Sequence, residues 1–183
     1  MIKVIKNFFN GKIKLIKLKK FKDQRGYFME NYNYKTFKKI GINEIFCQDN
    51  ESLSKRKGTI RGLHFQKPPF SQSKLIQVRQ GEIFDVFIDI KKTSKTFGKY
   101  KSINLKSNDN LILYIHHSFA HGFCSLTNNT IVTYKTSKNY SPKNEKTIKY
   151  DDPIINIKWP KLNKDFIISN KDLKGINLNN IYK

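Results

Sequence analysis

The chain has 183 residues, enough for one domain with a substantial core, and 38% of them are hydrophobic, including 14 Phe and 9 Tyr. Lys and Arg number 36 against 14 Asp and Glu, which gives a net charge of +22 that attracts anions. The basic residues are spread along the whole chain and are nearly all Lys, and this distribution argues against a nucleic-acid-binding protein. No long apolar stretch predicts a membrane span or a signal peptide, and the 2 cysteines are too few for a disulfide framework, so we expect a cytoplasmic protein with no membrane partner.

Short β-type runs dominate the chain from its beginning. The pattern predicts strands over 13–19 and 27–32 around a turn at 23–26, then a short helix over 34–40 that ends at Gly41. Further strands are expected over 44–49, 59–65, 74–79, 82–90, 99–105, 111–115 and 130–136. Turn residues separate these runs at near-regular spacing, and no linker divides the chain, so the sequence predicts one all-β domain, a sandwich or barrel.

The run 59–66 (TIRGLHFQ) brings three polar side chains of different chemistry into one apolar strand. Alternation along a strand places His64 and Gln66 on the same face, with Arg61 earlier in the run and Lys74 close behind it. A guanidinium fork, a titratable base and an amide would then line one end of a cavity. This pattern indicates a binding or catalytic site.

The four histidines do not have the spacing of a metal site. Metal sites of the cupin kind usually begin with a His-x-His pair, and here Gln66 stands where the partner of His64 would be. His116 and His117 are adjacent and cannot both point inward from a strand. We therefore expect no metal. His121 is either a buried, hydrogen-bonded histidine or part of the site.

Without a metal, His64 is the natural general base, because an imidazole exchanges protons near neutral pH. It needs an orienting carboxylate, for which Asp172 is a candidate, and Tyr134 is a candidate acid on the opposite face of a substrate. Asp85 lies within an apolar strand and needs a partner. Neutralisation by Lys74 or Arg61 in a polar cavity and a plain structural salt bridge both remain open.

Several short motifs occur in a defined order along the chain. They comprise DQRGYFME at 23–30, QDN at 48–50, IRGLHFQKPP at 60–69, QSKL at 72–75, GEIFDVFID at 81–89, FAHGF at 119–123, Tyr134, YSP at 140–142 with Glu145, DDP at 151–153, and WP at 159–160. Over about 13–175 this chain resembles the dTDP-4-dehydrorhamnose 3,5-epimerase family. The resemblance implies a cupin-like β jelly roll with a few short peripheral helices, filling residues 1–183 as one domain.

The resemblance also implies roles for individual residues. His64 would be the base, paired with Asp172, Tyr134 the acid on the other face, and Lys74 the cation near the sugar C4 oxygen. Substrate-binding residues would be Arg25, Phe28, Glu30, Gln48, Asn50, Arg61, His121, Tyr140 and Glu145. The expected reaction inverts C3 and C5 of a nucleotide-diphosphate 4-keto-6-deoxy sugar through an enolate, and it needs neither a metal nor a redox cofactor.

The family also implies a homodimer in which an N-terminal strand crosses to the partner, while residues from about 160 to 183 pack on the barrel. The chain departs from the family pattern at His116 and Ser118, where a proline and a glycine are usual, at Lys91 for an arginine, and at Tyr150 for a tryptophan. Alternatives are therefore a C3-only or C5-only epimerase, a keto-isomerase on a related nucleotide sugar, and a non-catalytic cupin that binds sugar nucleotides.

Overall fold

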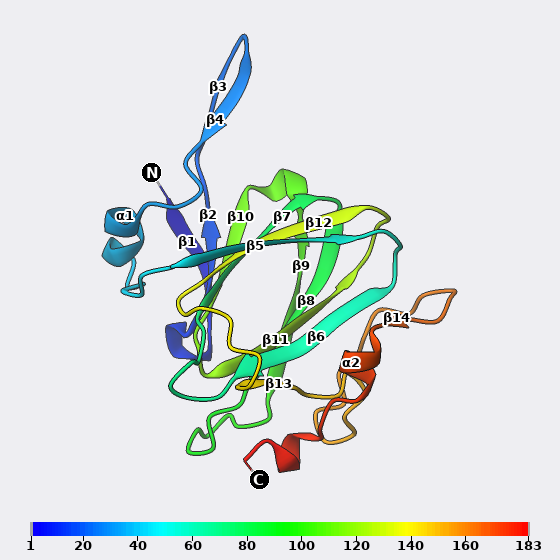
Figure 1. Cartoon of the computed structure of the whole chain (residues 1–183). Coiled ribbons are helices and arrows are strands. Elements are labelled where there is room, and N and C mark those ends of the chain that lie inside the picture. Colours follow the sequence, from blue (N-terminus) through cyan, green and yellow to red (C-terminus); the bar gives the residue numbers. More distant parts are fainter. Residues whose placement is uncertain (1, 183) are drawn as a thin grey trace.

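Two sheets face each other in the computed structural model, which describes residues 2–182, and their strands enclose a barrel-like interior (Figure 1). The first sheet has the order β1-β2-β10-β7-β12-β5, with β1 Lys3–Phe8, β2 Ile13–Lys17, β10 Leu111–Ile115, β7 Lys74–Gln80, β12 Thr130–Thr136 and β5 Gln48–Ser54. The second has the order β13-β6-β11-β8-β9, with β13 Glu145–Thr147, β6 Thr59–Gln66, β11 Phe119–Ser125, β8 Glu82–Asp89 and β9 Tyr100–Lys106, and β14 Ile167–Ile168 beside β6. The expected all-β jelly roll is confirmed.

Apolar side chains from the inner faces of both sheets form the core. Phe87 of β8, Val132 of β12 and Leu113 of β10 lie in one buried cluster between the sheets. A second cluster covers the outer face of β6, where Leu63 packs with Ile181 of the C-terminal segment. Leu63 and Phe65 of β6 thus belong to this outer cluster, while His64 and Gln66 alternate with them and face the interior.

Few elements lie outside the two sheets. The helices are α1 Tyr34–Lys39 and α2 Asn170–Leu173, with short 3-10 turns at Phe9–Gly11, Ser107–Asp109 and Leu178–Asn180. The hairpin of β3 Lys20–Asp23 and β4 Gly26–Met29 projects away from the barrel (Figure 1). Within residues 2–182, no helix has both the length and the apolar character that a membrane crossing requires.

The predicted elements agree with the structure where alternation or turn residues were strong. The helix predicted over 34–40 is present as α1, and Gly41 follows it with φ 77°, a left-handed conformation that suits glycine. The strand predicted over 44–49 is wrong, because β5 covers Gln48–Ser54 and pairs there with β12. The prediction also missed β11, which is buried on both faces and therefore shows no alternation.

Two glycines bring β6 and β11 unusually close together. A Cβ on Gly62 would lie only 2.6 Å from the Cα of Gly122, so a side chain at either position would force the two strands apart. The ladder shifts register between His121 and Phe123, and His121 pairs directly with His64. The close approach thus places two histidines side by side on neighbouring strands.

Candidate active site

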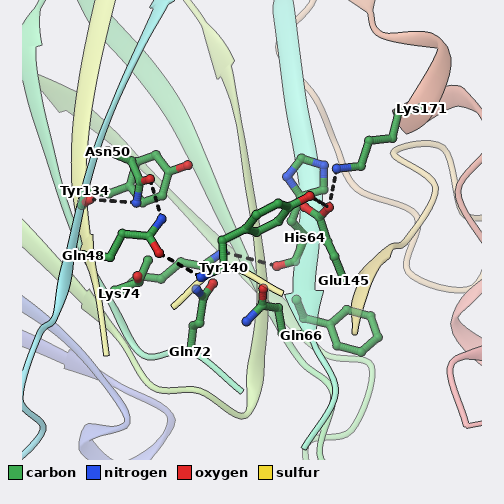
Figure 2. A pocket seen from close by; sticks show the side chains of 12 residues that line it. Gln48, Asn50, His64, Gln66, Gln72, Lys74, Tyr134, Tyr140, Glu145 and Lys171 are labelled. Atoms are coloured by element: carbon green, nitrogen blue, oxygen red, sulfur yellow. Dashed lines mark hydrogen bonds and ion pairs between the residues drawn. The ribbon is translucent and has the colours of Figure 1, made fainter. Parts of the chain in front are cut away.

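The polar residues of β6 face a cavity that opens between the two sheets. It consists of two adjoining hollows of about 350 and 460 Å³, and both are lined by His64, Lys74, Tyr134 and Lys171. Figure 2 shows that side chains from both sheets converge on the first hollow. The sequence predicted that Arg61, His64 and Gln66 line one end of a cavity. In the structure His64 lines both hollows, whereas Arg61 lines the second and Gln66 the first.

His64 is held by a carboxylate from the far end of the chain. His64 Nε2 and Asp172 Oδ1 lie 2.7 Å apart, and the Gly62 N–H donates to the other carboxylate oxygen at 3.2 Å. Burial alone would raise the pKa of Asp172, but the hydrogen bonds from His64, Gly62 and Ser169 outweigh it and the pKa lies below its usual value. The ionised carboxylate accepts the Nε2 hydrogen, so Nδ1 of the neutral imidazole carries the lone pair that can take a proton.

A second histidine–carboxylate pair lies beside the first. His121 Nε2 and Asp85 Oδ2 are 2.8 Å apart, and the side chain of Asp85 is fully buried. Burial lowers the pKa of the imidazole and raises that of the carboxyl, against their mutual attraction. The partner that Asp85 requires is thus His121, and the charge of Lys74 also lowers the pKa of Asp85. Arg61 is hydrogen-bonded to Ser54 instead.

Lys74 supplies the positive charge inside the cavity. It is 8% exposed, and its Nζ lies 3.4 Å from the backbone oxygen of His64. Burial lowers the pKa of Lys74 to about 8, while Glu145 and Asp85 oppose this shift. The ammonium form therefore still predominates at neutral pH, in a site where little water screens it.

Tyr134 reaches the cavity from the opposite sheet. It belongs to β12, whereas His64 belongs to β6 of the other sheet. Burial raises the pKa of Tyr134, with the negative charge of Glu145 adding to the effect, so the phenol keeps its proton at neutral pH. A proton acceptor and a proton donor thus stand on opposite walls of the cavity.

The mouth of the first hollow is a hydrogen-bonded group of polar and aromatic residues (Figure 2). The Tyr140 hydroxyl donates to Glu145 Oε2 at 2.6 Å, and Lys171 Nζ donates to the same oxygen. The Tyr140 N–H donates to the side chain of Gln48 at 2.8 Å, and Gln48 in turn donates to Asn50 at 2.7 Å. Half-exposed Tyr140 therefore presents an aromatic face at the mouth.

Sequence reasoning missed Lys171, which lines both hollows. The only available signal was its position directly before Asp172, the residue already proposed to orient His64. Burial lowers the pKa of Lys171, but the hydrogen bond to Glu145 outweighs this and raises it overall. Lys171 is therefore a cation at the junction of the hollows.

Gln66 connects two loops at the edge of the cavity. Its amide donates to the backbone oxygens of Phe70 at 2.6 Å and Asn139 at 3.3 Å, and its carbonyl accepts the Ser141 N–H at 2.7 Å. The side chain is almost fully buried, so these bonds are shielded from water. Gln66 thus fixes the segment that carries Tyr140.

The predicted substrate-binding residues divide into two groups. Arg61 lines the second hollow and is held by hydrogen bonds to Ser54 and to the backbone oxygen of Leu53. In contrast, the predicted contacts Arg25, Phe28 and Glu30 line neither hollow. Arg25 and Phe28 lie on the projecting β3–β4 hairpin, and Glu30 directly follows it. Across residues 2–182 no group of three or more His, Cys, Asp or Glu side chains has the arrangement of a metal site.

Comparisons with known proteins agree on one family. The profile described as dTDP-4-dehydrorhamnose 3,5-epimerase matches residues 11–180. A dTDP-4-dehydrorhamnose 3,5-epimerase of Shigella flexneri is 45% identical over 158 residues, which cover 86% of this chain and 86% of the relative.

Two solved structures extend the likeness to three dimensions. The crystal structure of dTDP-4-dehydrorhamnose 3,5-epimerase from Bacillus anthracis, with TDP and PPi bound, has a TM-score of 0.92 and 41% identity over 97% of this chain and 99% of that one. The epimerase from Legionella pneumophila in complex with dTDP-4-keto-L-rhamnose has a TM-score of 0.92 and 37% identity over 99% of this chain and 95% of that one.

Proposed function

The chain belongs to the dTDP-4-dehydrorhamnose 3,5-epimerase family, and from this membership we propose that it converts dTDP-4-keto-6-deoxy-D-glucose to dTDP-4-keto-L-rhamnose. The observation that carries the proposal is that His64 and Tyr134 lie on facing sheets and line one cavity together with Lys74. Inversion of a carbon requires that a proton leave from one face and return to the other. An acceptor and a donor on opposite walls meet that requirement.

The ketone at C4 makes the hydrogens on C3 and C5 acidic, because their loss gives an enolate. His64 Nδ1 accepts the proton while Asp172 stabilises the resulting imidazolium through Nε2. The Lys74 ammonium stabilises the enolate oxygen, which carries the developing charge, in a site that water screens poorly. The Tyr134 hydroxyl then returns a proton to the opposite face. His64 releases its proton to solvent and the Tyr134 phenolate regains one from solvent, after which the same steps at the second carbon complete the reaction.

The remaining cavity residues contact parts of the substrate that lie away from the reacting carbons. Arg61 and Lys171 supply the positive charge for a diphosphate, and Tyr140 supplies an aromatic face for a nucleotide base. Because this binding energy comes from groups that do not react, it positions the sugar carbons against His64.

The test is the identity of the product. The purified protein is incubated with dTDP-4-keto-6-deoxy-D-glucose, the ketone is reduced with borohydride, and the released sugars are separated by configuration. The proposal expects L-rhamnose and its C4 epimer 6-deoxy-L-talose, the two reduction products in which both C3 and C5 are inverted. Products that are inverted at C3 alone or at C5 alone would make this a single-centre epimerase, and an unchanged sugar would refute epimerisation of this substrate.

We also propose that the protein acts as a homodimer in which the β3–β4 hairpin completes the partner's cavity. Phe28 is 69% exposed and Arg25 extends into solvent, yet both are of the residue types that bind a nucleotide and a diphosphate. A hairpin that projects from its own barrel is suited to reach a second copy (Figure 1). The free cysteines Cys47 and Cys124 fit the further proposal of a reducing, cytoplasmic location.

A complementation experiment tests this arrangement. The variants His64→Ala and Arg25→Ala should each be inactive or weakened. If the hairpin of one protomer completes the cavity of its partner, a mixed dimer contains one cavity in which both His64 and Arg25 are native. Mixing the two variants after mild dissociation should therefore restore activity. If light scattering finds a monomer, or if the mixed sample stays as inactive as its components, the proposed exchange is wrong.

A further inference from the structure

A second cavity, of about 640 Å³, lies where turns at one end of the barrel meet. The strands β2 and β11 begin there, and β8 and β10 end there, because Ile13 pairs with Ile115 and Phe119 pairs with Asp89. Phe65 and Gln66 contribute to this cavity and also to the active-site cavity. Strand β6 thus provides a wall common to both, while the catalytic side chains described above do not line the second one.

The side chains of this second cavity are unusually one-sided in charge. Lys12, Lys67 and Lys91 line it together with His116 and His117, and no Asp or Glu is among its described lining residues. Its remaining surface is partly apolar, with Phe65, Ile90 and Ile181 among the contributors. The three ammonium groups around an apolar floor leave a net positive potential with no carboxylate among the lining residues to neutralise it, and the imidazoles add hydrogen-bonding groups.

Main-chain hydrogen bonds hold the segments that carry these lysines and histidines together. The His116 N–H donates to the backbone oxygen of Lys12 at 3.1 Å, and the Ile90 N–H donates to the backbone oxygen of Ser118 at 3.0 Å. Lys12, His116 and Lys91 therefore start from backbone segments that are fixed against each other. The site is built by the fold itself.

His116 presents a hydrogen-bond donor with a defined orientation. The Ser118 N–H donates to His116 Nδ1 at 3.2 Å, so the neutral imidazole carries its hydrogen on Nε2. Burial, together with the neighbouring charges of His117, Lys12 and Lys91, lowers the pKa of His116 to about 4, while Glu44 opposes the shift. Glu44 is already engaged by the hydroxyls of Tyr114 and Ser73. Positive charge is therefore disfavoured at this imidazole until an anion arrives.

We propose that this cavity is a second anion-binding site, which takes a phosphate group carried on an apolar body. The phosphate oxygens would accept from His116 Nε2–H and from the lysine ammonium groups, since charge-assisted hydrogen bonds to an oxyanion are among the strongest available. The apolar side chains would contact the rest of the ligand, a contact that free phosphate cannot make. His116 and Lys91, two departures from the family pattern, thereby acquire a common role.

The four histidines allow a direct test by imidazole NMR, with each signal assigned by single substitution. The probes are inorganic phosphate and phenyl phosphate, each compared with potassium chloride at the same ionic strength. We expect saturable shifts of the His116 and His117 signals with both probes and tighter binding of phenyl phosphate. Shifts confined to His64 and His121, or shifts that chloride reproduces, would overturn the site. Equal binding of the two probes would overturn the requirement for an apolar body.

A matched pair of variants separates the cavity from the general charge of the protein. The double variant Lys12→Met/Lys91→Met should weaken phosphate binding at His116 by about tenfold or more, because two charge-assisted contacts are lost. The control Lys39→Met/Lys55→Met removes the same charge from exposed positions outside the cavity and should leave binding unchanged. Equal weakening in both double variants would mean that only the overall field attracts phosphate.

Discussion

Replacing Asp172 by Asn tests how the proposed base is prepared for catalysis. The asparagine carbonyl can still accept from the Gly62 N–H, so the backbone contact survives. Its NH₂ group, however, then faces His64 Nε2 at the position where the carboxylate oxygen now lies 2.7 Å away. The imidazole must accept that hydrogen bond on Nε2 and carry its own hydrogen on Nδ1, so the nitrogen that should receive the substrate proton is blocked.

The magnitude follows from the loss of general-base catalysis by His64. A positioned general base contributes about 10²–10⁴-fold in rate, and at about 1.36 kcal/mol per tenfold this corresponds to about 2.7–5.4 kcal/mol of the activation barrier. The carboxylate is nearly fully buried, so no bulk water replaces it as the partner of the imidazole. We expect kcat to fall by about 10³-fold with little change in the affinity for dTDP, because Asp172 is not among the proposed nucleotide contacts.

The assay is the rate of deuterium uptake from D₂O at C3 and C5, together with calorimetric binding of dTDP. Asp151→Asn is the matched control, since Asp151 is exposed and lies outside the cavity. A variant Asp172→Asn that retains a rate within about threefold of the native protein would refute the tautomer argument. Equal losses of dTDP affinity and of kcat would also refute it, because they would indicate a structural role for Asp172.

Three further predictions concern other parts of the site. Tyr134→Phe should still exchange substrate hydrogens in D₂O but form the epimerised product about 10²-fold or more slowly, and an unchanged product rate would remove Tyr134 as the acid. Because Lys74 is charged below its pKa of about 8, kcat should decline as the pH rises through that value, and Lys74→Met should abolish this alkaline limb along with most of the activity. Gln66→Leu removes three partly buried hydrogen bonds to backbone groups, so it should lower the free energy of unfolding by about 1–3 kcal/mol and raise KM more than it lowers kcat; urea titration and steady-state kinetics measure the two effects.

Local patterns predicted the parts of the fold that obey local rules. The apolar and polar alternation of 59–66 predicted β6 and the face on which His64 lies, and Gly41 predicted the end of the short helix. The strand at 48–54 was misplaced because its residues are mostly polar, and its position is determined by pairing with β12 instead of by its own composition. Such a pairing involves residues about 80 positions apart and leaves no local signal.

The site was predictable to the extent that chemistry singles out residue types. His64 and Tyr134 are suited to proton transfer, and family resemblance linked His64 to Asp172 although 108 positions separate them. The partner of Asp85 was not predictable, since the choice between a lysine, an arginine and His121 depends on the register of β11 against β8. Lys171 went unnoticed because a chain with 36 Lys and Arg makes any one lysine uninformative.

The central claim is proton transfer at two carbons by one base and one acid in a single cavity. Proton NMR of the metal-stripped protein with dTDP-4-keto-6-deoxy-D-glucose in D₂O tests it most directly. The account predicts that deuterium enters at both C3 and C5, and that uptake at both positions disappears in the His64→Ala variant. Deuterium at one carbon only, or uptake that persists at either carbon without His64, would contradict it.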